Sequence, residues 1–345
     1  MTVSLIIPTY NRAHLIALAI ESALAQTRVP DEILIIDDGS TDNTAEVLSR
    51  FAAPVRLLRQ PNRGRSVARN LGLRAATGDA VLFLDSDDLL LPRTVETFTA
   101  VLERQPDVDV VYGDAELIDI KGRRIGLNSE RTLGRRPSGN ILGELGRRCC
   151  LTMASMVRRS ALAGIAFEEG MECGEDYDFW RRLAARSQFA YVDVPVMCYR
   201  MHEGMTVTAD PTNTLDMELE VQRRIQAMPE FAALPRRERA GAYAAHGAKQ
   251  AMRNRGRVAR SMFWRAIRTD PSYLTAYALL GLSLFSLRPL QYAVLKRRRM
   301  IGNEVAAETG DAVLERLRTT KCAELPTPND AERELVGAVE ESVYG

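Results

Sequence analysis

Short apolar runs alternate with helical segments along the first 115 residues. Each run is rich in β-branched residues or leucine and ends near a proline or a polar cluster, which predicts strands. These strands cover residues 3–7, 33–36, 55–58, 80–84 and 108–112. Between them, apolar or small residues recur at three- and four-residue spacing, which predicts helices. These helices cover residues 13–25, 41–50, 66–76 and 92–104.

Strands that alternate with such helices predict an α/β fold with a mostly parallel sheet flanked by helices. In sheets of this kind, ligands bind beyond the carboxyl ends of the strands. Polar clusters occupy three of these ends, at residues 9–11, 37–38 and 85–88. We therefore expect the functional site along this edge of the sheet.

The pattern becomes irregular after residue 115. Residues 121–148 are rich in glycine and arginine without clear periodicity, so we expect a mobile loop region there. A helix over residues 176–185 and a strand over residues 190–198 follow, and the pattern is helical after about residue 215. We therefore expect an α/β domain over residues 1–215, divided into halves at 1–115 and 116–215, and a C-terminal helical extension.

Charge is balanced over the whole chain but unevenly distributed. The formal net charge of +1 argues against a general nucleic-acid-binding protein. Residues 236–300 nevertheless contain 15 Lys and Arg against two acidic residues, whereas residues 301–345 contain ten acidic residues against four Lys and Arg. This reversal predicts a basic helical extension over residues 216–300 and an acidic polar tail over residues 301–345.

The basic extension contains an apolar run at residues 273–287, followed by Arg288 and a basic cluster at residues 296–299. A membrane-spanning helix needs about 20 apolar residues, so this run of 15 is too short. A basic amphipathic segment can instead lie on an anionic membrane surface, which predicts peripheral membrane contact through residues 272–299. Packing of this helix against the α/β domain is the alternative. The sequence leaves both open, as it does the oligomeric state.

The cysteines and the N-terminus favour a cytoplasmic protein. The chain has five cysteines without CxxC spacing, which indicates neither a disulfide framework nor a zinc ribbon. The first residues enter a predicted strand without the basic and apolar regions of a signal peptide. We expect the protein in the cytoplasm, at the inner face of the membrane if the peripheral contact forms.

Two acidic clusters lie at predicted strand ends. Residues 85–88 follow a strand that should be wholly buried, and their carboxylates are the ligands that Mg²⁺ and Mn²⁺ prefer. Such a metal neutralises charge on a departing diphosphate. Asp37 and Asp38 end a neighbouring strand, where a carboxylate can accept a hydrogen bond from a nucleobase or a ribose hydroxyl. Both clusters also fit a simpler role as helix caps.

Three further groups complete the candidate chemistry. Glu175 and Asp176 begin a predicted helix, where a carboxylate either acts as a general base or stabilises the helix dipole. His202 follows the last predicted strand and is either a metal ligand or a packed side chain. Arg69 and two other arginines lie on a glycine-containing loop that enters a helix, where they bind phosphate oxygens or remain solvated.

Taken in this order, these segments resemble the family 2 inverting glycosyltransferases of the GT-A fold. The resemblance covers roughly residues 1–210, and although each piece is weak alone, six in this order and spacing are specific. It rests on SLIIPTYNR at residues 4–12, IIDDGSTD at 35–42, NRGRSVARN at 62–70 with Gly72, DSDD at 85–88, EDYDFW at 175–180 and YRMH at 199–202.

The resemblance implies that a sugar is transferred by a single in-line displacement with inversion at the anomeric carbon. It implies that Asp85 and Asp87 form the DxD pair for Mn²⁺ or Mg²⁺, with His202 as a further ligand of the metal or the diphosphate. Asp176 would be the general base, with Glu175 beside it. The implied donor-nucleotide site contains Pro8, Thr9, Tyr10, Asp38, Arg69, Asp85 and Ser86.

The partners implied are a UDP-, GDP- or dTDP-linked sugar, of hexosyl type, and a glycan, lipid-linked or protein acceptor, as in cell-surface glycan synthesis. A nucleotidyltransferase of similar fold is an alternative, but the segment at residues 8–12 lacks the glycine that such enzymes place there. A non-catalytic nucleotide-sugar-binding relative is a second alternative. The lack of a GxGxxG motif after the first strand argues against a dehydrogenase.

Overall fold

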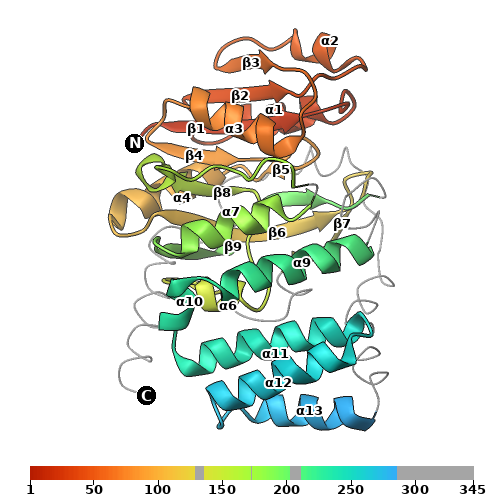
Figure 1. Cartoon of the computed structure of the whole chain (residues 1–345). Helices are drawn as coiled ribbons and strands as arrows, with labels where there is room; N and C mark the ends of the chain where they lie inside the picture. The colour runs from red at the N-terminus through yellow and green to blue at the C-terminus, as the bar shows by residue number, and fades with distance from the viewer. Residues whose placement is uncertain (129–135, 172, 203–210, 286–345) are drawn as a thin grey trace.

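The computed structural model describes residues 1–128, 136–171, 173–202 and 211–285 (Figure 1). The acidic tail predicted for residues 301–345 and the basic cluster at residues 296–299 lie outside the described residues. Within them, one nine-stranded sheet occupies the first 200 residues and five helices follow.

Four strands make the N-terminal half of the sheet, and all are parallel, in the order β3-β2-β1-β4. The predicted parallel sheet flanked by helices is confirmed here, because each apolar run forms one buried strand or, for β3, a partly exposed edge strand. These strands are β1 (Val3–Thr9), β2 (Glu32–Asp37), β3 (Val55–Arg59) and β4 (Ala80–Phe83).

The second half of the sheet mixes strand directions. Strand β8 pairs antiparallel with both β4 and β6, and β6 runs parallel to β9. Strand β9 therefore lies beside β6 and ends at the same edge as the parallel strands. The remaining strands are β5 (Leu89–Leu90), β6 (Val110–Ile118), β7 (Arg124–Leu127), β8 (Ser155–Arg158) and β9 (Phe189–Arg200).

The expectation of a mobile loop over residues 121–148 is wrong for the part that the structure describes. Strand β7 pairs with β6, and the short helix α6 (Leu142–Leu145) lies in the core. Each element has four residues, which is too few for a sequence periodicity to emerge. Arg136, in the same segment, is also buried and lies 3.6 Å from Asp114 on β6.

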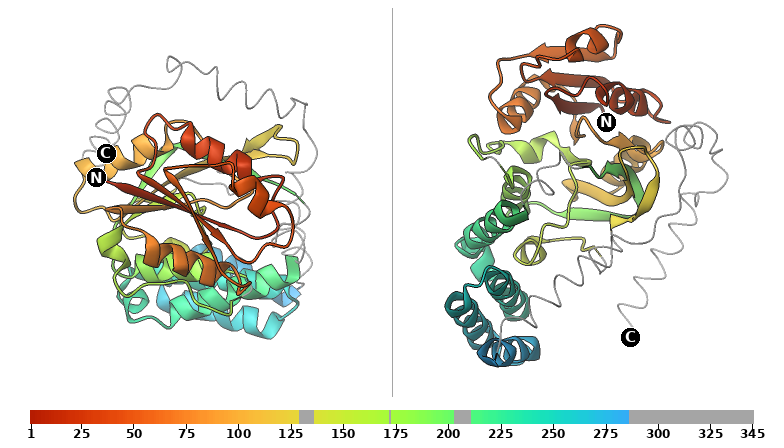
Figure 2. Two further views of the ribbon diagram at one scale, coloured as in Figure 1. Left: turned by 90° about the horizontal axis from the view of Figure 1, so that it is seen from above. Right: turned by 90° about the vertical axis from the view of Figure 1, so that its right-hand side faces the viewer.

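Helices cover both faces of the sheet (Figure 2). Successive residues of a strand point to opposite faces, so Ile6 packs under α3 and α7 while Leu5 and Ile7 pack under α1 and α4. This two-sided burial explains why β1 and β2 are apolar throughout. The helices of this part are α1 (Ile16–Leu24), α2 (Thr44–Leu48), α3 (Arg65–Ala75), α4 (Thr94–Arg104) and α7 (Glu175–Ala184), with the 3₁₀ turn η1 (Arg159–Leu162).

The helical extension stacks beyond α7, with α9, α11, α12 and α13 in succession (Figures 1 and 2). Among the described residues, none of the helices is both long and apolar enough to cross a membrane. The extension consists of α9 (Pro211–Gln226), α10 (Pro229–Ala233), α11 (Arg236–Met252), α12 (Gly256–Thr269) and α13 (Leu274–Phe285).

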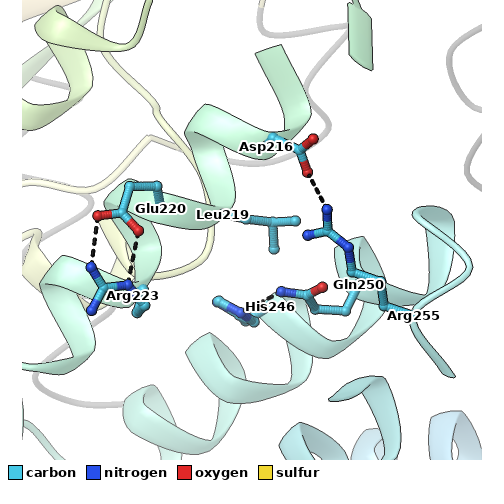
Figure 3. A pocket seen from close by; sticks show the side chains of 7 residues that line it. All are labelled: Asp216, Leu219, Glu220, Arg223, His246, Gln250 and Arg255. Atoms are coloured by element: carbon cyan, nitrogen blue, oxygen red, sulfur yellow. Dashed lines mark hydrogen bonds and ion pairs between the residues drawn. The ribbon is translucent and has the colours of Figure 1, made fainter. Parts of the chain in front are cut away.

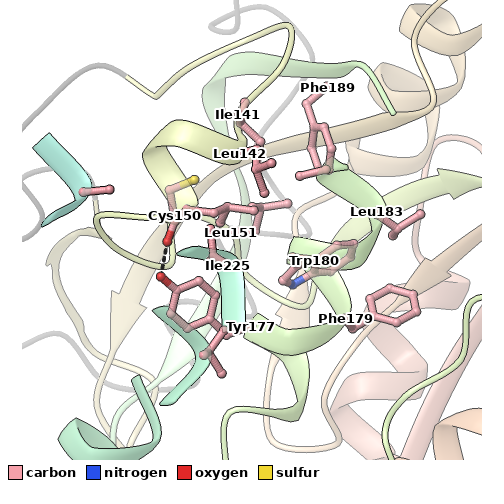
Figure 4. Packing of buried hydrophobic residues seen from close by; sticks show 14 of the residues in the cluster. Ile141, Leu142, Cys150, Leu151, Tyr177, Phe179, Trp180, Leu183, Phe189 and Ile225 are labelled. Atoms are coloured by element: carbon pink, nitrogen blue, oxygen red, sulfur yellow. Dashed lines mark hydrogen bonds between the residues drawn. The ribbon is translucent and has the colours of Figure 1, made fainter. Parts of the chain in front are cut away.

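One hydrophobic cluster joins this extension to the sheet. Phe179 and Trp180 of α7 pack against Phe83 of β4 with their rings edge to edge or edge to face. Figure 4 shows these α7 side chains beside Ile225 of α9 and the residues of α6. The same cluster continues to Phe263 of α12. The division at residue 215 remains a prediction, and the two parts share a core.

Candidate functional site

Asn11 joins the ends of β1 and β2. Its side-chain oxygen accepts hydrogen bonds from the backbone N–H of Thr41 (2.8 Å) and Asp42 (3.3 Å), and its own N–H donates to the Ser40 hydroxyl (3.0 Å). It has a φ of 52°, a left-handed conformation that asparagine adopts more readily than most residues. Asn11 belongs to the polar cluster predicted at the end of the first strand, but no individual role was predicted for it.

Asp38 holds the loop between β3 and α3. Its carboxylate accepts from the Gln60 side chain (2.7 Å) and from the backbone N–H groups of Arg63 (3.0 Å) and Gly64 (2.8 Å). The neighbouring Gly39 has a φ of 77°, and a Cβ there would lie 2.7 Å from the Asn62 backbone nitrogen. The loop can therefore lie over the strand end because Asp38 accepts its N–H groups and because Gly39 leaves room for its backbone.

Residues predicted to line the nucleoside pocket lie beside Asp38. Thr9 pairs in register with Asp37, and its carbonyl accepts the Asp38 N–H at 2.9 Å. The Thr9 hydroxyl is buried without a hydrogen-bond partner among the described residues. Pro8 is buried within β1, whereas Tyr10 is exposed at the mouth of this strand end. The structure brings these residues together, and their contact with a nucleotide remains a prediction.

Arg69 connects the two halves of the sheet. It is 3% exposed, and its guanidinium contacts Asp85 Oδ1 at 2.7 Å and Glu175 Oε1 at 2.8 Å. It also lies 5.3 Å from the centre of the Phe167 ring. The guanidinium thus pairs with the buried carboxylate of Glu175 and the partly exposed carboxylate of Asp85, which supplies the hydrogen-bonded partners that a buried charge needs. Both terminal nitrogens of Arg69 bind carboxylates in the structure. Direct contact of Arg69 with a nucleotide remains a prediction.

Asp87 and His202 lie in contact at the end of β4 and β9. The His202 Nε2 is 3.1 Å from Asp87 Oδ2, and the Arg12 Nε is 3.6 Å from the same oxygen. Arg200 donates from its Nε to the Asp87 carbonyl at 2.9 Å. Arg12 and Arg200 lie within the segments at residues 4–12 and 199–202, but no role was predicted for either residue. Only the sheet topology shows that they meet Asp87.

Asp88 is the buried member of the acidic cluster. Its carboxyl accepts the backbone N–H of Arg200 at 2.9 Å, which pins β9 against the turn after β4. Burial, and then the neighbouring carboxylates of Asp87 and Asp85, raise the pKa of Asp88 well above its ordinary value. Ser86 is also buried in this turn. The turn therefore presents Asp87 outward while Asp88 fastens it to the sheet.

The side chains at Asp87 are too few to hold a divalent cation alone, so the cation would also need oxygen atoms from a bound substrate or from water. Among residues 1–128, 136–171, 173–202 and 211–285, no three or more His, Cys, Asp and Glu side chains form a group arranged to hold a metal. Asp87 and His202 provide one carboxylate and one imidazole in contact, a pair that suits Mn²⁺ better than Mg²⁺. Both metals commonly take remaining ligands from phosphate oxygens and water.

Asp176 has the properties of a proton acceptor. It lies in the first turn of α7, directly after Glu175, which is held by Arg69. Burial, and then the charge of Glu175, raise the pKa of Asp176 to about 6, while Arg69 opposes this rise. A carboxylate with a pKa near 6 is a stronger base than an ordinary one and remains ionised at neutral pH.

Asp178 fixes the position of α7. Its fully buried carboxylate contacts the guanidinium groups of Arg181 (2.6 Å), Arg182 (2.9 Å) and Arg224 of α9 (3.1 Å). Two of these arginines lie one turn further along α7, and the third comes from the helical extension. The acidic motif at residues 175–180 thus combines a candidate base with an anchor for the helix that carries it.

A cavity of about 300 Å³ lies apart from these residues, between α9 and α11 (Figure 3). His246 and Gln250 line it and are 3.1 Å apart, with Leu219 above them. None of the residues predicted from sequence lines it. The candidate site is therefore the strand-end cluster rather than this cavity.

A model described as Glycosyl transferase family 2 matches residues 4–165. An uncharacterized glycosyltransferase of Rickettsia typhi is 30% identical over 224 residues, which are 63% of this chain and 68% of that protein. One of Rickettsia felis is 33% identical over 212 residues, which are 61% of this chain and 34% of that protein. The match thus spans about a third of the Rickettsia felis relative.

Two solved structures share the fold. S. aureus TarS 1–349 in complex with UDP-GlcNAc has a TM-score of 0.55 and 19% identity, covering 94% of both chains. The mannosyltransferase PcManGT from Pyrobaculum calidifontis, in complex with GDP-Man and Mn²⁺, has a TM-score of 0.55 and 19% identity, covering 92% of this chain and 87% of that one. With the parallel strand ends and their carboxylates, these matches confirm the resemblance seen in the sequence. The chain belongs to glycosyltransferase family 2 and has the GT-A fold.

Proposed function

We propose that the chain transfers a hexosyl group from a nucleotide-diphosphate sugar to an acceptor hydroxyl, with inversion, in glycan synthesis. The observation that carries this proposal is the Arg69 bridge, which holds Asp85 of the DxD turn and Glu175 of the base helix on one guanidinium. Donor and acceptor chemistry would then meet in one place, as a single in-line displacement requires. The nucleotidyltransferase alternative is not retained, because the chain belongs to a glycosyltransferase family.

The donor would bind along the strand ends. Tyr10, the Thr9 hydroxyl and Pro8 would line a nucleoside pocket, and Asp38 would shape its wall through the loop at residues 60–64. Asp87 and His202 would hold Mn²⁺ or Mg²⁺, with Asp85 and Ser86 on the donor side. When bound, the metal would stabilise negative charge on the leaving diphosphate. Arg12, 3.6 Å from Asp87, would add a second positive charge.

The acceptor hydroxyl would lose its proton to Asp176. The raised pKa of Asp176 makes this residue a suitable general base, and the charge of Glu175 would help to keep that pKa high. Arg69 would position Glu175 rather than contact the acceptor. The solved relatives bind UDP-GlcNAc in one case and GDP-Man in the other, so both donor classes, and dTDP-sugars, are candidates here. A glycan, a lipid-linked saccharide or a protein remains the proposed acceptor.

Two substitutions test this assignment against a non-catalytic relative. A thermal-shift screen of UDP-, GDP- and dTDP-sugars with Mn²⁺ first identifies the donor. We expect Asp87→Ala to abolish transfer and to weaken Mn²⁺-dependent donor binding, because it removes a metal ligand. Asp176→Asn should lower transfer by about 10²–10⁴-fold with donor binding intact.

Asp193→Asn, an exposed carboxylate on β9, is the matched control and should behave as the wild type. Full turnover by Asp176→Asn would remove the general-base assignment. The absence of a response to every donor would favour a protein that does not transfer sugars.

A further inference from the structure

The outer surface of the last two described helices is unusually apolar. Leu274 is 76% exposed, Leu284 67%, Leu282 47% and Tyr277 45%, all on α13, and Trp264 of α12 is 54% exposed. Singly exposed apolar residues are ordinary, but five large ones on two adjacent helices form a patch of the kind that marks a contact site. We call this patch the α12–α13 surface (Figure 1).

Helix α13 has no polar side for water. Its opposite face, with Ala276 and Leu280, is buried toward α11 and α12, and Ser283 is also buried. The whole helix reads LTAYALLGLSLF, without a charged residue. A helix packed on one side of a globular protein ordinarily carries charged and polar residues on its other side. The outward leucines of α13 therefore call for a second apolar environment.

The surroundings of this surface are cationic. Helices α12 and α13 contain four arginines, Arg257, Arg260, Arg265 and Arg268, and no Asp or Glu. Arg265, Arg268 and Trp264 line one shallow depression. The sequence continues with Arg288 and the cluster at residues 296–299. Tryptophan and arginine beside leucine are the residues that settle at the boundary between lipid headgroups and acyl chains.

We propose that the α12–α13 surface binds a bilayer that contains anionic phospholipids. The exposed leucines would enter the headgroup boundary, while the exposed Arg257 and Arg268 contact phosphate groups. Arg265 lies 4.4 Å over the Tyr243 ring of α11 and would add positive charge from there. The apolar run at residues 273–287 is shorter than the about 20 residues of a spanning helix, so the proposed contact is peripheral. A second copy of the chain fits this surface less well, because association would bring the arginines of both copies together without acidic partners on these helices.

The proposed surface shares residues 274–284 with the membrane contact expected for residues 272–299, and it adds α12. Residues 286–299 lie outside the described residues. Arg260 contributes indirectly, since it donates to the Ser283 carbonyl at 3.2 Å and so fixes α13 on α12. This proposal does not depend on the sugar-transfer chemistry, because the surface contains none of the strand-end residues.

Vesicle co-sedimentation of the full chain tests the proposal. We expect binding to phosphatidylcholine vesicles that contain phosphatidylglycerol, little binding to phosphatidylcholine alone, and weaker binding as salt is raised. Leu274→Glu/Leu282→Glu should reduce binding at least tenfold, since it places two acids at the anionic surface. Arg257→Gln/Arg268→Gln should also reduce it about tenfold or more, since each surface arginine contributes appreciably.

Leu57→Glu is the matched control, because Leu57 is exposed on β3 at the far end of the molecule. It should bind like the wild type, and circular dichroism with donor thermal shift should show every variant folded. Absence of wild-type binding to the anionic vesicles would overturn the proposal. Self-association without vesicle binding, lost in the leucine variant, would overturn it in favour of a second copy.

Discussion

The pH dependence of sugar transfer should report the carboxylate pair at the start of α7. Burial and the adjacent Glu175 raise the pKa of Asp176 to about 6. A base is active when ionised, so the ionised fraction of Asp176 should fall from about 90% at pH 7 to about 10% at pH 5. Transfer by the wild type should therefore drop roughly tenfold over this range as the pH is lowered.

Glu175→Gln is the perturbation that separates this explanation from general acid denaturation. It removes the like charge and leaves Arg69 to stabilise ionised Asp176, so the pKa of Asp176 should fall toward its ordinary value. Burial, the larger cause of the raised pKa, remains in this variant, so its transfer should fall less steeply between pH 7 and pH 5 than that of the wild type.

The assay is single-turnover release of the nucleoside diphosphate with saturating donor and Mn²⁺, so that binding steps do not enter the profile. Circular dichroism at each pH checks that both proteins stay folded. A flat wild-type profile between pH 5 and pH 7 would refute the assignment of the base. An equal slope in both proteins would refute the role given to Glu175.

Three predictions concern stability, measured by urea unfolding. Asp178→Ala should cost about 3 kcal/mol, because it removes the fully buried carboxylate that three partly buried arginines share. Glu168→Ala removes an exposed partner of Arg224, one of these arginines, and should cost under about 1 kcal/mol. Burial and nearby cations lower the pKa of His246 to about 4, so the unfolded chain takes up a proton first and the contribution of His246 to stability should fall by about 2 kcal/mol from pH 7 to pH 5. His246→Gln should therefore lose about 2 kcal/mol less stability than the wild type over this range, and equal losses in the two proteins would contradict the prediction. Gly39→Ala should be more destabilising than Gly64→Ala, since both have positive φ but only the first would clash with backbone.

The sequence was sufficient for the parallel half of the sheet because buried strands such as β1 are apolar on both faces. It also located the acidic turn at residues 85–88 and the start of α7. The contacts between these segments could not be predicted from sequence patterns, since Arg69 and Glu175 are 106 positions apart and His202 and Asp87 are 115 apart. The pairing of β9 with β5 and β6 brings His202 to Asp87, and the packing of α3 and α7 on one face of the sheet brings Arg69 to Glu175.

Very short helices and strands also could not be predicted from the sequence. Strand β5 has two residues and α6 has four, so neither repeats a pattern often enough to be recognised. Strand β8 has four residues, and no strand was predicted there. In each case its partners, rather than its own propensity, determine the structure.

The anchoring of α7 has a consequence for how the molecule opens. Asp178 contacts Arg224 on α9, and Glu218 and Asp216 of α9 contact Lys249 and Arg253 on α11. These ion pairs and the shared core run from the base helix into the extension. Local opening should therefore follow cooperative units rather than sequence boundaries. In hydrogen exchange, the amides of α7 should be protected together with those of α9 and α11, and any event that loosens the extension would reach Asp176 through the helix that carries it.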